Sequence, residues 1–561
     1  MAGQADMNAQ GPALPRPGGP GMKRRDFLAL ATKAGAAALV LGPPVLLAGC
    51  ANPTTGAKGP SPKPKPKPPG SSPPIAPSAP TDADWAGLAR RMSGNLVLPN
   101  SPAYTAARQS YDPIFDSNSP QAVAYCRTNS DVQTGVDFAR THGVALTPRC
   151  GGHSYAGYST GPGLVLDVSS MNTIEAGPTA GVGAGSRLID VYGALAAGGV
   201  SIPAGSCPTV GVAGLTLGGG VGVTSRAYGL TCDRLSWIEI VTADGRLRRV
   251  HAGSDPDLFW ACRGGGGGNF GVVTKFGFNT HPISPVSVFS LAYDWNLASG
   301  VLAGWQAWAP DAPDRLFSNL HLDSGTGRPG GRPTLSVAGV YLGPAHDLDR
   351  LLGPLTETAG GAPRSRYQQD TSYLEAMMIE AGCAHLSPAQ CHLAQSGSPG
   401  TLSRQAFVAK SDFFRASMPT EGISILIEAM SARAASPGTG AVAVILDAWG
   451  GAISRVSPTD SAFVARRARF SAQYYAGLPT DASLNAIHTA SAALNGLRAK
   501  LAPYASGYAY LNYIDPDLAN WPQAYYGTNY PRLTRVKSAY DPQGVFRFPQ
   551  GITPLASGVT S

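Results

Sequence analysis

Three glycine-rich stretches constrain this chain more than any other feature of its sequence. They occupy residues 147–163, 203–222 and 263–271. Backbone this poor in side chains can lie close against a flat ligand, and consecutive glycine N–H groups can converge on an anion. None of the three has the Gly-x-Gly-x-x-Gly spacing, with an acidic residue about 20 positions later, of a nicotinamide Rossmann domain. The sequence also lacks a Walker A motif, so both of these nucleotide-binding classes are disfavoured.

Composition limits the remaining classes. The chain has 561 residues, enough for two or three domains, and 43% are hydrophobic, which indicates a globular protein. Only 14% are charged, which excludes a coiled coil. The net charge of +8 is concentrated near the N-terminus, because residues 1–80 hold nine Lys or Arg against two Asp. The remainder is close to neutral, and we therefore expect no nucleic-acid partner for the folded part.

Residues 1–50 have the features of an export signal. Arg24 and Arg25, followed by Asp-Phe-Leu, resemble the twin-arginine signal. The uncharged run over residues 34–49 is shorter than the roughly 20 residues of a membrane-spanning helix. It ends in Leu-Ala-Gly before Cys50, which resembles a bacterial lipobox, whose cysteine is lipidated and becomes the mature N-terminus. The alternative is an ordinary cleaved signal with an incidental cysteine. We expect an exported protein, anchored by lipid at the outer face of the cytoplasmic membrane or in the cell envelope.

Residues 51–82 form a linker rich in Pro and Lys. Residues 61–69 read Ser-Pro-Lys-Pro-Lys-Pro-Lys-Pro-Pro, and each proline fixes φ and removes a hydrogen-bond donor. An extended spacer of this kind would hold the folded domain away from a membrane surface, and the alternative is a disordered linker with no geometric role. The twin-arginine route exports proteins that have already folded, which suggests a cofactor loaded in the cytoplasm.

Helix and strand signals place the first glycine-rich stretch on a turn. Residues 131–143 have helical apolar spacing and end in Gly143, and residues 144–146 read as a short strand. Arg149 to Ser154 then follow that strand, where glycine N–H groups and the Arg149 guanidinium could bind a diphosphate.

The second half of the chain has a different character. Residues 286–345 and 440–455 are β-rich with alternating hydrophobicity, whereas residues 460–475 and 481–501 show helical patterns. Strands in blocks with helices between them predict an antiparallel sheet covered on one face by helices.

Five spaced motifs together resemble the berberine bridge enzyme-like flavoprotein oxidases of the vanillyl-alcohol oxidase / p-cresol methylhydroxylase superfamily. The resemblance spans about residues 100–552. The matching segments are residues 149–154, 205–211, 259–271, 510–518 and 525–550.

The resemblance implies an α+β fold in three folded segments. Residues 115–284 would form a two-part FAD-binding domain of the p-cresol methylhydroxylase type. Residues 285–505 would form the substrate domain, with its helix-covered antiparallel sheet, and residues 506–552 a C-terminal segment that completes the FAD domain.

It also implies FAD held by two covalent bonds, from His153 to the 8α-methyl and from Cys207 to C6 of the ring. Both side chains are nucleophiles that can add to an electron-poor flavin. The alternatives are an ordinary loop histidine and a buried or disulfide-bonded cysteine. Further residues expected at the cofactor are Arg149, Cys150, Gly151, Gly152, Ser154, Gly205, Thr209, Val210, Gly211, Gly214, Gly218, Gly268, Asn269, Gly271, Val273 and Asn512.

Alcohol oxidation needs a base for the hydroxyl proton. If residues 510–514 form a strand, Tyr510 and Asn512 point to the same face, and the family places both at the flavin. We therefore predict Tyr510 as the base, although its phenol needs help to ionise, because a free tyrosine has a pKa of about 10. Asp447 matches the position of an assisting aspartate in oligosaccharide-oxidising relatives, and a turn-forming role is its alternative.

Two further positions are candidates for the substrate side. Gln473 matches a residue that faces the substrate, and Tyr530 is a further catalytic candidate whose alternative is a core tyrosine. Plant-type members have a lysine where this chain has Ser471, which argues against plant-alkaloid or monolignol chemistry.

Cys383 and Cys391 stand apart from these motifs. The pattern Cys-x-His-x5-Cys-His could bind zinc, but in an exported protein a disulfide that closes the short loop is favoured. We predict no metal site.

The function predicted is an FAD-dependent oxidase. It would take hydride from an alcohol carbon, with the anomeric carbon of a sugar or oligosaccharide as the leading substrate, to flavin N5, and O2 would be reduced to H2O2. A tailoring oxidase of a secondary metabolite and a non-catalytic ligand-binding lipoprotein are the alternatives.

Overall fold

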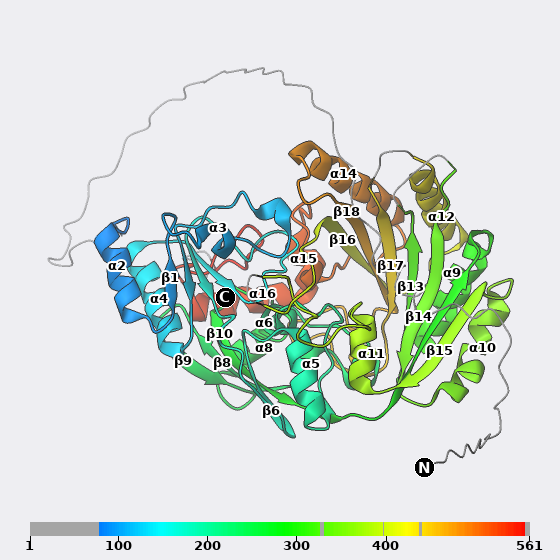
Figure 1. Cartoon of the computed structure of the whole chain (residues 1–561), viewed down its shortest axis with the longest axis horizontal. Helices are drawn as coiled ribbons and strands as arrows, with labels where there is room; N and C mark the ends of the chain where they lie inside the picture. Colours follow the sequence, from blue (N-terminus) through cyan, green and yellow to red (C-terminus); the bar gives the residue numbers. More distant parts are fainter. Residues whose placement is uncertain (1–77, 326–329, 396–397, 437–439, 556–561) are drawn as a thin grey trace, which may run out of the picture.

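Three β-sheets of four, five and seven strands follow one another along the chain in the computed structural model (Figure 1), which describes residues 78–325, 330–395, 398–436 and 440–555. The predicted signal over residues 1–50 and most of the predicted linker lie outside the described residues. None of the described helices is both long enough and apolar enough to cross a membrane.

The first sheet supports the Arg149–Ser154 turn. Its order is β1-β2-β4-β3, with β4 parallel to both β2 and β3. The helix α4 (Asn129–His142) ends at Gly143, whose φ of 64° is left-handed, so the predicted helix is confirmed. The strands are β1 (Asn95–Val97), β2 (Ala122–Tyr125), β3 (Leu146–Arg149) and β4 (Leu164–Asp167).

The second sheet is antiparallel, in the order β5-β6-β10-β8-β9. Its strands are β5 (Ile174–Glu175), β6 (Thr179–Gly183), β8 (Leu235–Val241), β9 (Leu247–Val250) and β10 (Val272–Asn279). The strands β7 (Val200–Ser201) and β11 (His281–Pro282) form a separate pair. The helices of this half are α2 (Asp82–Arg91), α3 (Tyr104–Ala107), α5 (Leu188–Ala197), α6 (Val212–Leu217), α7 (Ser225–Tyr228) and α8 (Pro256–Ala261).

The third sheet is the predicted antiparallel sheet of the second half, in the order β15-β12-β14-β13-β17-β18-β16. One of its faces packs on four helices, which Figure 1 shows on the side away from the first half. The strands are β12 (Val286–Tyr293), β13 (Leu316–Asp323), β14 (Thr334–Tyr341), β15 (Ser365–Thr371), β16 (Ala406–Phe414), β17 (Val442–Ala448) and β18 (Phe470–Leu478). The four covering helices are α9 (Ala298–Trp308), α10 (Leu348–Thr358), α12 (Thr420–Ala435) and α14 (Leu484–Leu501). The α+β class and the helix-covered sheet are confirmed.

The other face of this sheet turns toward the first half. On β13, Leu320 and Leu322 belong to the core beneath the helices, whereas Phe317 packs with residues of the first half. Because side chains alternate along a strand, Asn319 and His321 share the face of Phe317. The short helices α11 (Tyr373–Glu380) and α13 (Ala452–Arg455) pack against α5 and α7 of the first half.

The helix predicted within residues 460–475 is wrong, because Phe470–Leu478 is strand β18. Phe470, Ala472 and Tyr474 enter the core beneath the helices, and the residues between them face the first half. Both faces of this strand are largely buried, so the sequence lacks the clear polar alternation of a half-exposed strand.

The C-terminal residues return to the first half, and Figure 1 shows α16 (Tyr530–Tyr540) there, packed on α8. Phe546 forms a parallel bridge with Leu146 beside the first sheet. The helix α15 (Trp521–Tyr526) precedes α16. The 3₁₀ helices are Pro113–Phe115, Thr231–Arg234, Trp295–Leu297, Ala309–Asp311, Ala345–Asp347, Leu511–Tyr513 and Gly527–Asn529.

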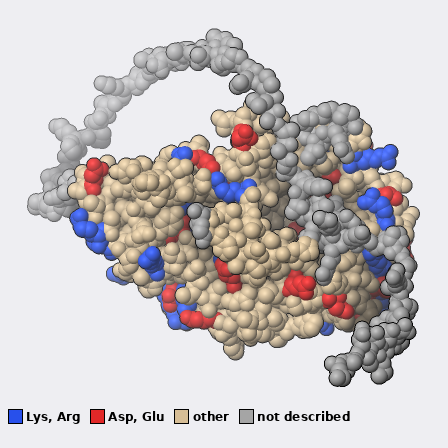
Figure 2. Space-filling view, viewed as in Figure 1, with Lys and Arg blue, Asp and Glu red and all other residues tan. Residues whose placement is uncertain are grey.

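Cys383 and Cys391 form a disulfide, as predicted, and the described residues hold no group of three ligands that could bind a metal ion. Five further described cysteines, including Cys207, are free thiols. On the face shown in Figure 2, Lys and Arg alternate with Asp and Glu in small, scattered groups.

Candidate active site

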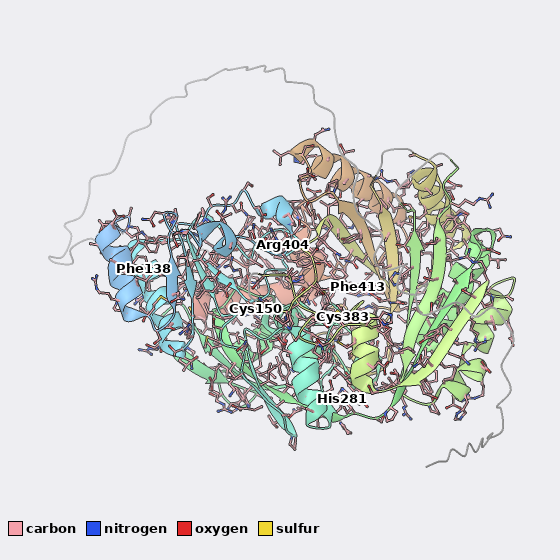
Figure 3. The ribbon with its side chains drawn as sticks, in the orientation of Figure 1. Phe138, Cys150, His281, Cys383, Arg404 and Phe413 are labelled. Atoms are coloured by element: carbon pink, nitrogen blue, oxygen red, sulfur yellow. A yellow bond between two sulfur atoms is a disulfide. The ribbon has the colours of Figure 1, made fainter. Side chains whose placement is uncertain are left out.

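A cavity of about 410 Å³ lies between the glycine-rich loops of the first half and the inward face of the third sheet. Its lining combines residues from all three glycine-rich stretches with residues of β13, β17, β18 and the segment after Tyr510. Cys150, which lines it, lies near the middle of the molecule (Figure 3).

The glycine side of the cavity is shaped for a flat ligand. A methyl group added to Gly214 would meet no protein atom within 4 Å, and the nearest atoms to one on Gly267 lie 3.9 Å away. These positions therefore face open space, and a larger side chain would fill it. Gly268 has a φ of +72°, a left-handed conformation that favours glycine. The wall fits a planar ring system that touches the backbone.

His153 lines the same cavity and is held in one orientation. Its Nε2 lies 2.9 Å from Thr209 Oγ1, and its ring stacks on Tyr111 with the ring centroids 3.7 Å apart. Burial lowers the pKa of His153 to about 3, so the imidazole is neutral at physiological pH. Because Nε2 is engaged by Thr209, Nδ1 is the ring nitrogen left with a lone pair or proton for another partner.

Cys207 also lines the cavity, as a free thiol. Burial raises the pKa of this thiol, while hydrogen bonds from Thr209 and Val210 lower it in part. Thr209 therefore contacts both of the predicted attachment residues. It does not itself line the cavity but lies behind His153.

Arg149 does not offer the free charge that we predicted for a diphosphate. Its Nε lies 2.5 Å from the Asp167 carboxylate, and its Nη2 donates to the carbonyl of Ala107 at 2.7 Å. The ion pair is almost fully buried, and the Asp167 carboxylate neutralises the guanidinium charge. Arg149 thereby connects β3 and β4 to α3. A second cavity-lining arginine, Arg547, was missed, although it lies inside the C-terminal motif.

Asn269 connects the third glycine-rich stretch to the C-terminal segment through hydrogen bonds. Its side-chain amide donates to Gly265 O at 3.0 Å and accepts from Ile552 N at 2.9 Å. Its own carbonyl accepts from Lys537 Nζ at 2.6 Å, and Lys537 is in turn paired with buried Asp541. The C-terminal segment therefore fixes the shape of the loop that lines the cavity.

Tyr510 lies in the cavity wall, but not on the strand that we predicted. The next three residues, Leu511–Tyr513, form a 3₁₀ helix, yet Asn512 Nδ2 still reaches Tyr510 Oη at 3.0 Å. The N–H groups of Gly220 and Val221 also donate to Oη, each at 3.1 Å. Burial raises the pKa of Tyr510 above its ordinary value, while these three donors act in the opposite direction.

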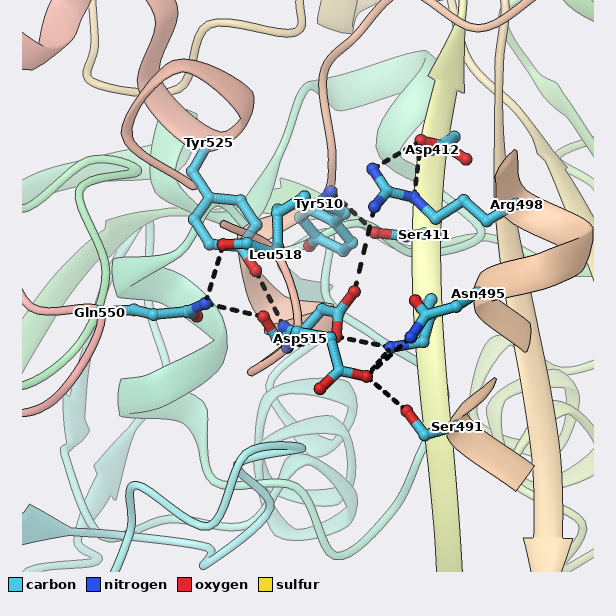
Figure 4. Close-up of polar contacts among 12 residues, drawn as sticks. Ser411, Asp412, Ser491, Asn495, Arg498, Tyr510, Asp515, Leu518, Tyr525 and Gln550 are labelled. Carbon is cyan, nitrogen blue, oxygen red and sulfur yellow. Dashed lines mark hydrogen bonds and ion pairs between the residues drawn. The ribbon is translucent and has the colours of Figure 1, made fainter. Parts of the chain in front are cut away.

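A polar network holds the Tyr510 segment against the third sheet (Figure 4). The Tyr510 N–H donates to Ser411 Oγ on β16 at 2.9 Å. Buried Lys410, the neighbour of Ser411, lies 2.8 Å from both Asp515 and Asp517. In the same network, Arg498 of α14 contacts Asp515 as well as Asp412 of β16. Tyr510 is thereby positioned by contacts with the second half of the protein.

The sheet side of the cavity is polar. Asp447 of β17 pairs in register with Asn319 of β13, and Gln473 of β18 donates to Tyr155 Oη at 3.0 Å. Burial raises the pKa of Asp447 to about 6, and a hydrogen bond with Ser471 lowers it in part. Asp447, Gln473 and Tyr510 are thus brought to one cavity.

Other lining residues were missed by sequence reasoning, among them the polar side chains of Asn319, His321 and Glu380. Asn319 and His321 alternate along β13, so a strand register could have indicated their shared face. Glu380 ends α11 and carries no local signal.

Besides Thr209, two predicted residues lie outside the cavity lining. Tyr530 stacks on Tyr526 with ring centroids 5.9 Å apart and lies edge-on to Trp521, so it is a packing residue of the C-terminal helices. Gly218 leaves room for Asn512, because an added methyl group would lie 2.0 Å from Asn512 Oδ1. All the other predicted cofactor residues line the cavity. They are Arg149, Cys150, Gly151, Gly152, His153, Ser154, Gly205, Cys207, Val210, Gly211, Gly214, Gly268, Asn269, Gly271, Val273 and Asn512.

The fold and this cavity define a flavin-dependent oxidoreductase, and comparison with known proteins agrees. The profile of the FAD binding domain family matches residues 120–251, and that of the berberine and berberine-like family matches residues 509–553. The chain is 34% identical over 475 residues to the uncharacterized FAD-linked oxidoreductase YgaK of Bacillus subtilis, covering 83% of this chain and 98% of that protein.

Solved structures give the same result. The BBE-like 1 protein of Physcomitrella patens has a TM-score of 0.76 and 30% identity, covering 84% of this chain and 99% of that one. A chitooligosaccharide oxidase has a TM-score of 0.75 and 25% identity, covering 84% of this chain and all of that one (100%). This chain belongs to the berberine bridge enzyme-like FAD-linked oxidoreductases.

Proposed function

We propose that this protein is an oxidase of sugars or oligosaccharides that acts on the anomeric alcohol carbon. The observation that carries the proposal is the meeting of Tyr510, Asp447 and Gln473 in the cavity that the glycine-rich loops line. The structural likeness to a chitooligosaccharide oxidase supports a carbohydrate substrate.

His153 and Cys207 would hold the FAD by covalent bonds. When bound, FAD supplies an acceptor for hydride, and O2 can then take up the electrons to give H2O2. In support, both side chains line one cavity, His153 is kept neutral by burial, and Cys207 is a free thiol. Formation of the second bond requires the Cys207 thiol to lose its proton, since the thiolate is the nucleophile.

Tyr510 would accept the proton of the substrate hydroxyl at Oη. The Gly220 and Val221 N–H groups and the Asn512 amide all donate to this oxygen, and donors that converge on one oxygen stabilise its negative form. Asp447 lies in the same cavity, where its carboxylate can accept a second substrate hydroxyl.

The first experiment asks whether the flavin is covalently bound. The chain from residue 51 onward is purified and precipitated with acid, and yellow colour is expected in the pellet. We expect His153→Ala and Cys207→Ala each to retain colour there, and the double variant to release it. Colour in the supernatant of the unaltered protein would contradict both bonds.

The second experiment tests the substrate. The holoenzyme is screened against mono- and oligosaccharides with peroxide as the readout, and against non-sugar alcohols as the comparison. Peroxide from reducing sugars supports the proposal. Turnover of non-sugar alcohols alone would instead identify a tailoring oxidase.

We further propose that the protein is exported and anchored through lipidated Cys50. This rests on the twin-arginine and lipobox patterns of residues 1–50.

A further inference from the structure

Glu380 occupies an unfavourable position that its local surroundings do not explain. It is the last residue of α11, where the helix macrodipole disfavours a negative charge. It lines the cavity close enough to Asp447 for the two charges to interact, and no described residue forms a hydrogen bond or ion pair with it. Such a departure from local preference, without a compensating contact, is typical of a functional residue.

The position of Glu380 is nevertheless fixed by the structure around it. Three residues further on, Cys383 forms the disulfide with Cys391. This disulfide packs in a small apolar cluster with Ile189 of α5, and His392 lies 3.0 Å from Asp190 of the same helix. The end of α11 is thus fastened to the FAD-binding half. Glu380 is therefore presented to the cavity by rigid elements.

Two groups with hydrogen-bond acceptors lie on this side of the cavity: Asp447, whose charge acts on Glu380, and Asn319, which pairs in register with Asp447. Asn319 Oδ1 is buried and has no partner, and Asp447 is a second carboxyl. Burial, together with Asp447, raises the pKa of Glu380 to about 7, and burial raises that of Asp447 to about 6. At pH 8 both carboxyls are therefore largely ionised. The imidazole of His321, which lines the same cavity, brings no positive charge, because burial lowers its pKa to about 4.

We propose that Glu380 is a specificity-determining residue that, with Asp447 and Asn319, makes the substrate end of the cavity select neutral polyhydroxylated substrates over sugar acids. Hydroxyl groups can donate to all three acceptors, whereas a substrate carboxylate has no proton to donate and meets like charge. An apolar alcohol would leave buried acceptors unpaired, which also disfavours its binding. The inference rests on the proposed sugar-oxidising function and refines its substrate class.

The test compares D-glucose with D-glucuronate, which differ in a carboxylate at C6. The ratio of their kcat/KM values is measured at pH 8 for the unaltered holoenzyme and for Glu380→Gln. Glu375→Gln is the matched control, because Glu375 lies on the same helix, exposed and outside the cavity lining. Glu380→Asp retains the charge and serves as the rescue. The shift in Tm caused by 1,5-anhydro-D-glucitol, which lacks the reacting hydroxyl, measures binding without turnover.

We expect the preference for glucose over glucuronate to fall by at least about tenfold in Glu380→Gln, because one of two repelling charges is removed. The preference should persist in Glu375→Gln and Glu380→Asp. The Tm shift with the anhydro sugar should shrink in Glu380→Gln, since an acceptor is weakened.

Two results would overturn the inference in distinguishable ways. If the unaltered enzyme oxidises glucose and glucuronate equally, or Glu380→Gln keeps the full preference, the role of Glu380 is wrong while sugar oxidation stands. If neither sugar is oxidised and the anhydro sugar does not shift Tm, the proposed function fails as well. A Glu380→Gln protein that has lost its flavin spectrum is replaced in the comparison by Asn319→Ala, for which the same loss of Tm shift is expected.

Discussion

At the scale of single residues, burial is the main influence on the ionisable groups around the cavity. It lowers the pKa of His153 to about 3 and raises that of Asp447 to about 6, and it raises the pKa of the Cys207 thiol. The flavin-facing wall therefore carries neutral nucleophiles, whereas the sheet-facing wall carries carboxyls. These two environments fit the proposed tasks of flavin attachment and substrate recognition.

Removal of the Tyr510 hydroxyl should slow oxidation without loss of the flavin. We expect Tyr510→Phe to lower the rate of anaerobic flavin reduction by about 10²–10⁴-fold, the usual contribution of a general base. Tyr530→Phe is the control, because Tyr530 lies outside the cavity lining. The rate is followed by the loss of flavin absorbance after mixing with sugar. A Tyr510→Phe enzyme as fast as the control would exclude the phenol as base.

Asp112 should make stability depend on pH. Desolvation raises its pKa to about 7, and its Oδ2 is buried without a partner. The folded state therefore binds the carboxyl proton of Asp112 more tightly than the unfolded state does. The free energy of unfolding falls as the pH rises from about 4 to 7, and the loss is at most about 1.4 kcal/mol for each unit by which the pKa is raised.

Asp112→Asn removes this titration, so its Tm should exceed that of the unaltered protein by more at pH 8 than at pH 5. The measurement is thermal unfolding of the holoenzyme at both pH values. Asp137→Asn is the control, since the Asp137 side chain on α4 is half exposed. An equal Tm difference at the two pH values would mean that Asp112 does not titrate in this range.

At the scale of elements, β16 links the third sheet to the segment that begins at Tyr510. Lys410 of this strand has a side chain that is 2% exposed, and it contacts Asp515 and Asp517, three and five residues beyond Asn512. Removing one member of a buried ion pair leaves the other charge uncompensated, which costs about 3–5 kcal/mol. We expect this destabilisation for Lys410→Met in urea unfolding. Lys275→Met, which breaks the exposed pair with Glu175, should cost about 1 kcal/mol or less. Similar losses in both would contradict the role of Lys410.

The sequence motifs identified the family and most of the cavity, because the residues of the glycine-rich wall, with His153 and Cys207, lie in short local segments. They did not indicate strand β18 or the 3₁₀ turn after Tyr510, whose conformations depend on packing between the halves. Glu380 was missed for the same reason, since only the docking of α11 on α5 brings it to Asp447. For Arg149 the sequence predicted a role that the structure does not support. Its charge was expected at a diphosphate, but Asp167 of the neighbouring strand neutralises it.

At the scale of the whole molecule, buried arginines join the two halves around the cavity. Arg226 of α7 donates to the carbonyls of Leu316 and Pro310 in the second half, at 2.9 and 3.0 Å. Arg466 reaches back to Asp233 with two bonds of 2.6 and 2.7 Å. A third arginine, Arg404 of the second half, which Figure 3 labels, donates to the carbonyl of Ser110 in the first half at 2.8 Å. Contacts from both directions hold the two walls of the site at a fixed separation.

The proposed anchor is tested in the whole cell. We expect labelled palmitate to be incorporated into the unaltered protein and the membrane fraction to contain it, because a diacylglyceryl group adds about 0.8 kcal/mol of membrane affinity per buried CH₂. Cys50→Ser should lose the label and leave the membrane fraction, while keeping the flavin, since Cys50 is not among the described residues that line the cavity. Cys126→Ser is the control, because Cys126 is buried in the first half and should not alter labelling. Replacement of Arg24 and Arg25 by Lys should retain the protein, with its flavin, in the cytoplasm. Label that persists in Cys50→Ser would show that this cysteine is not the site of lipid attachment.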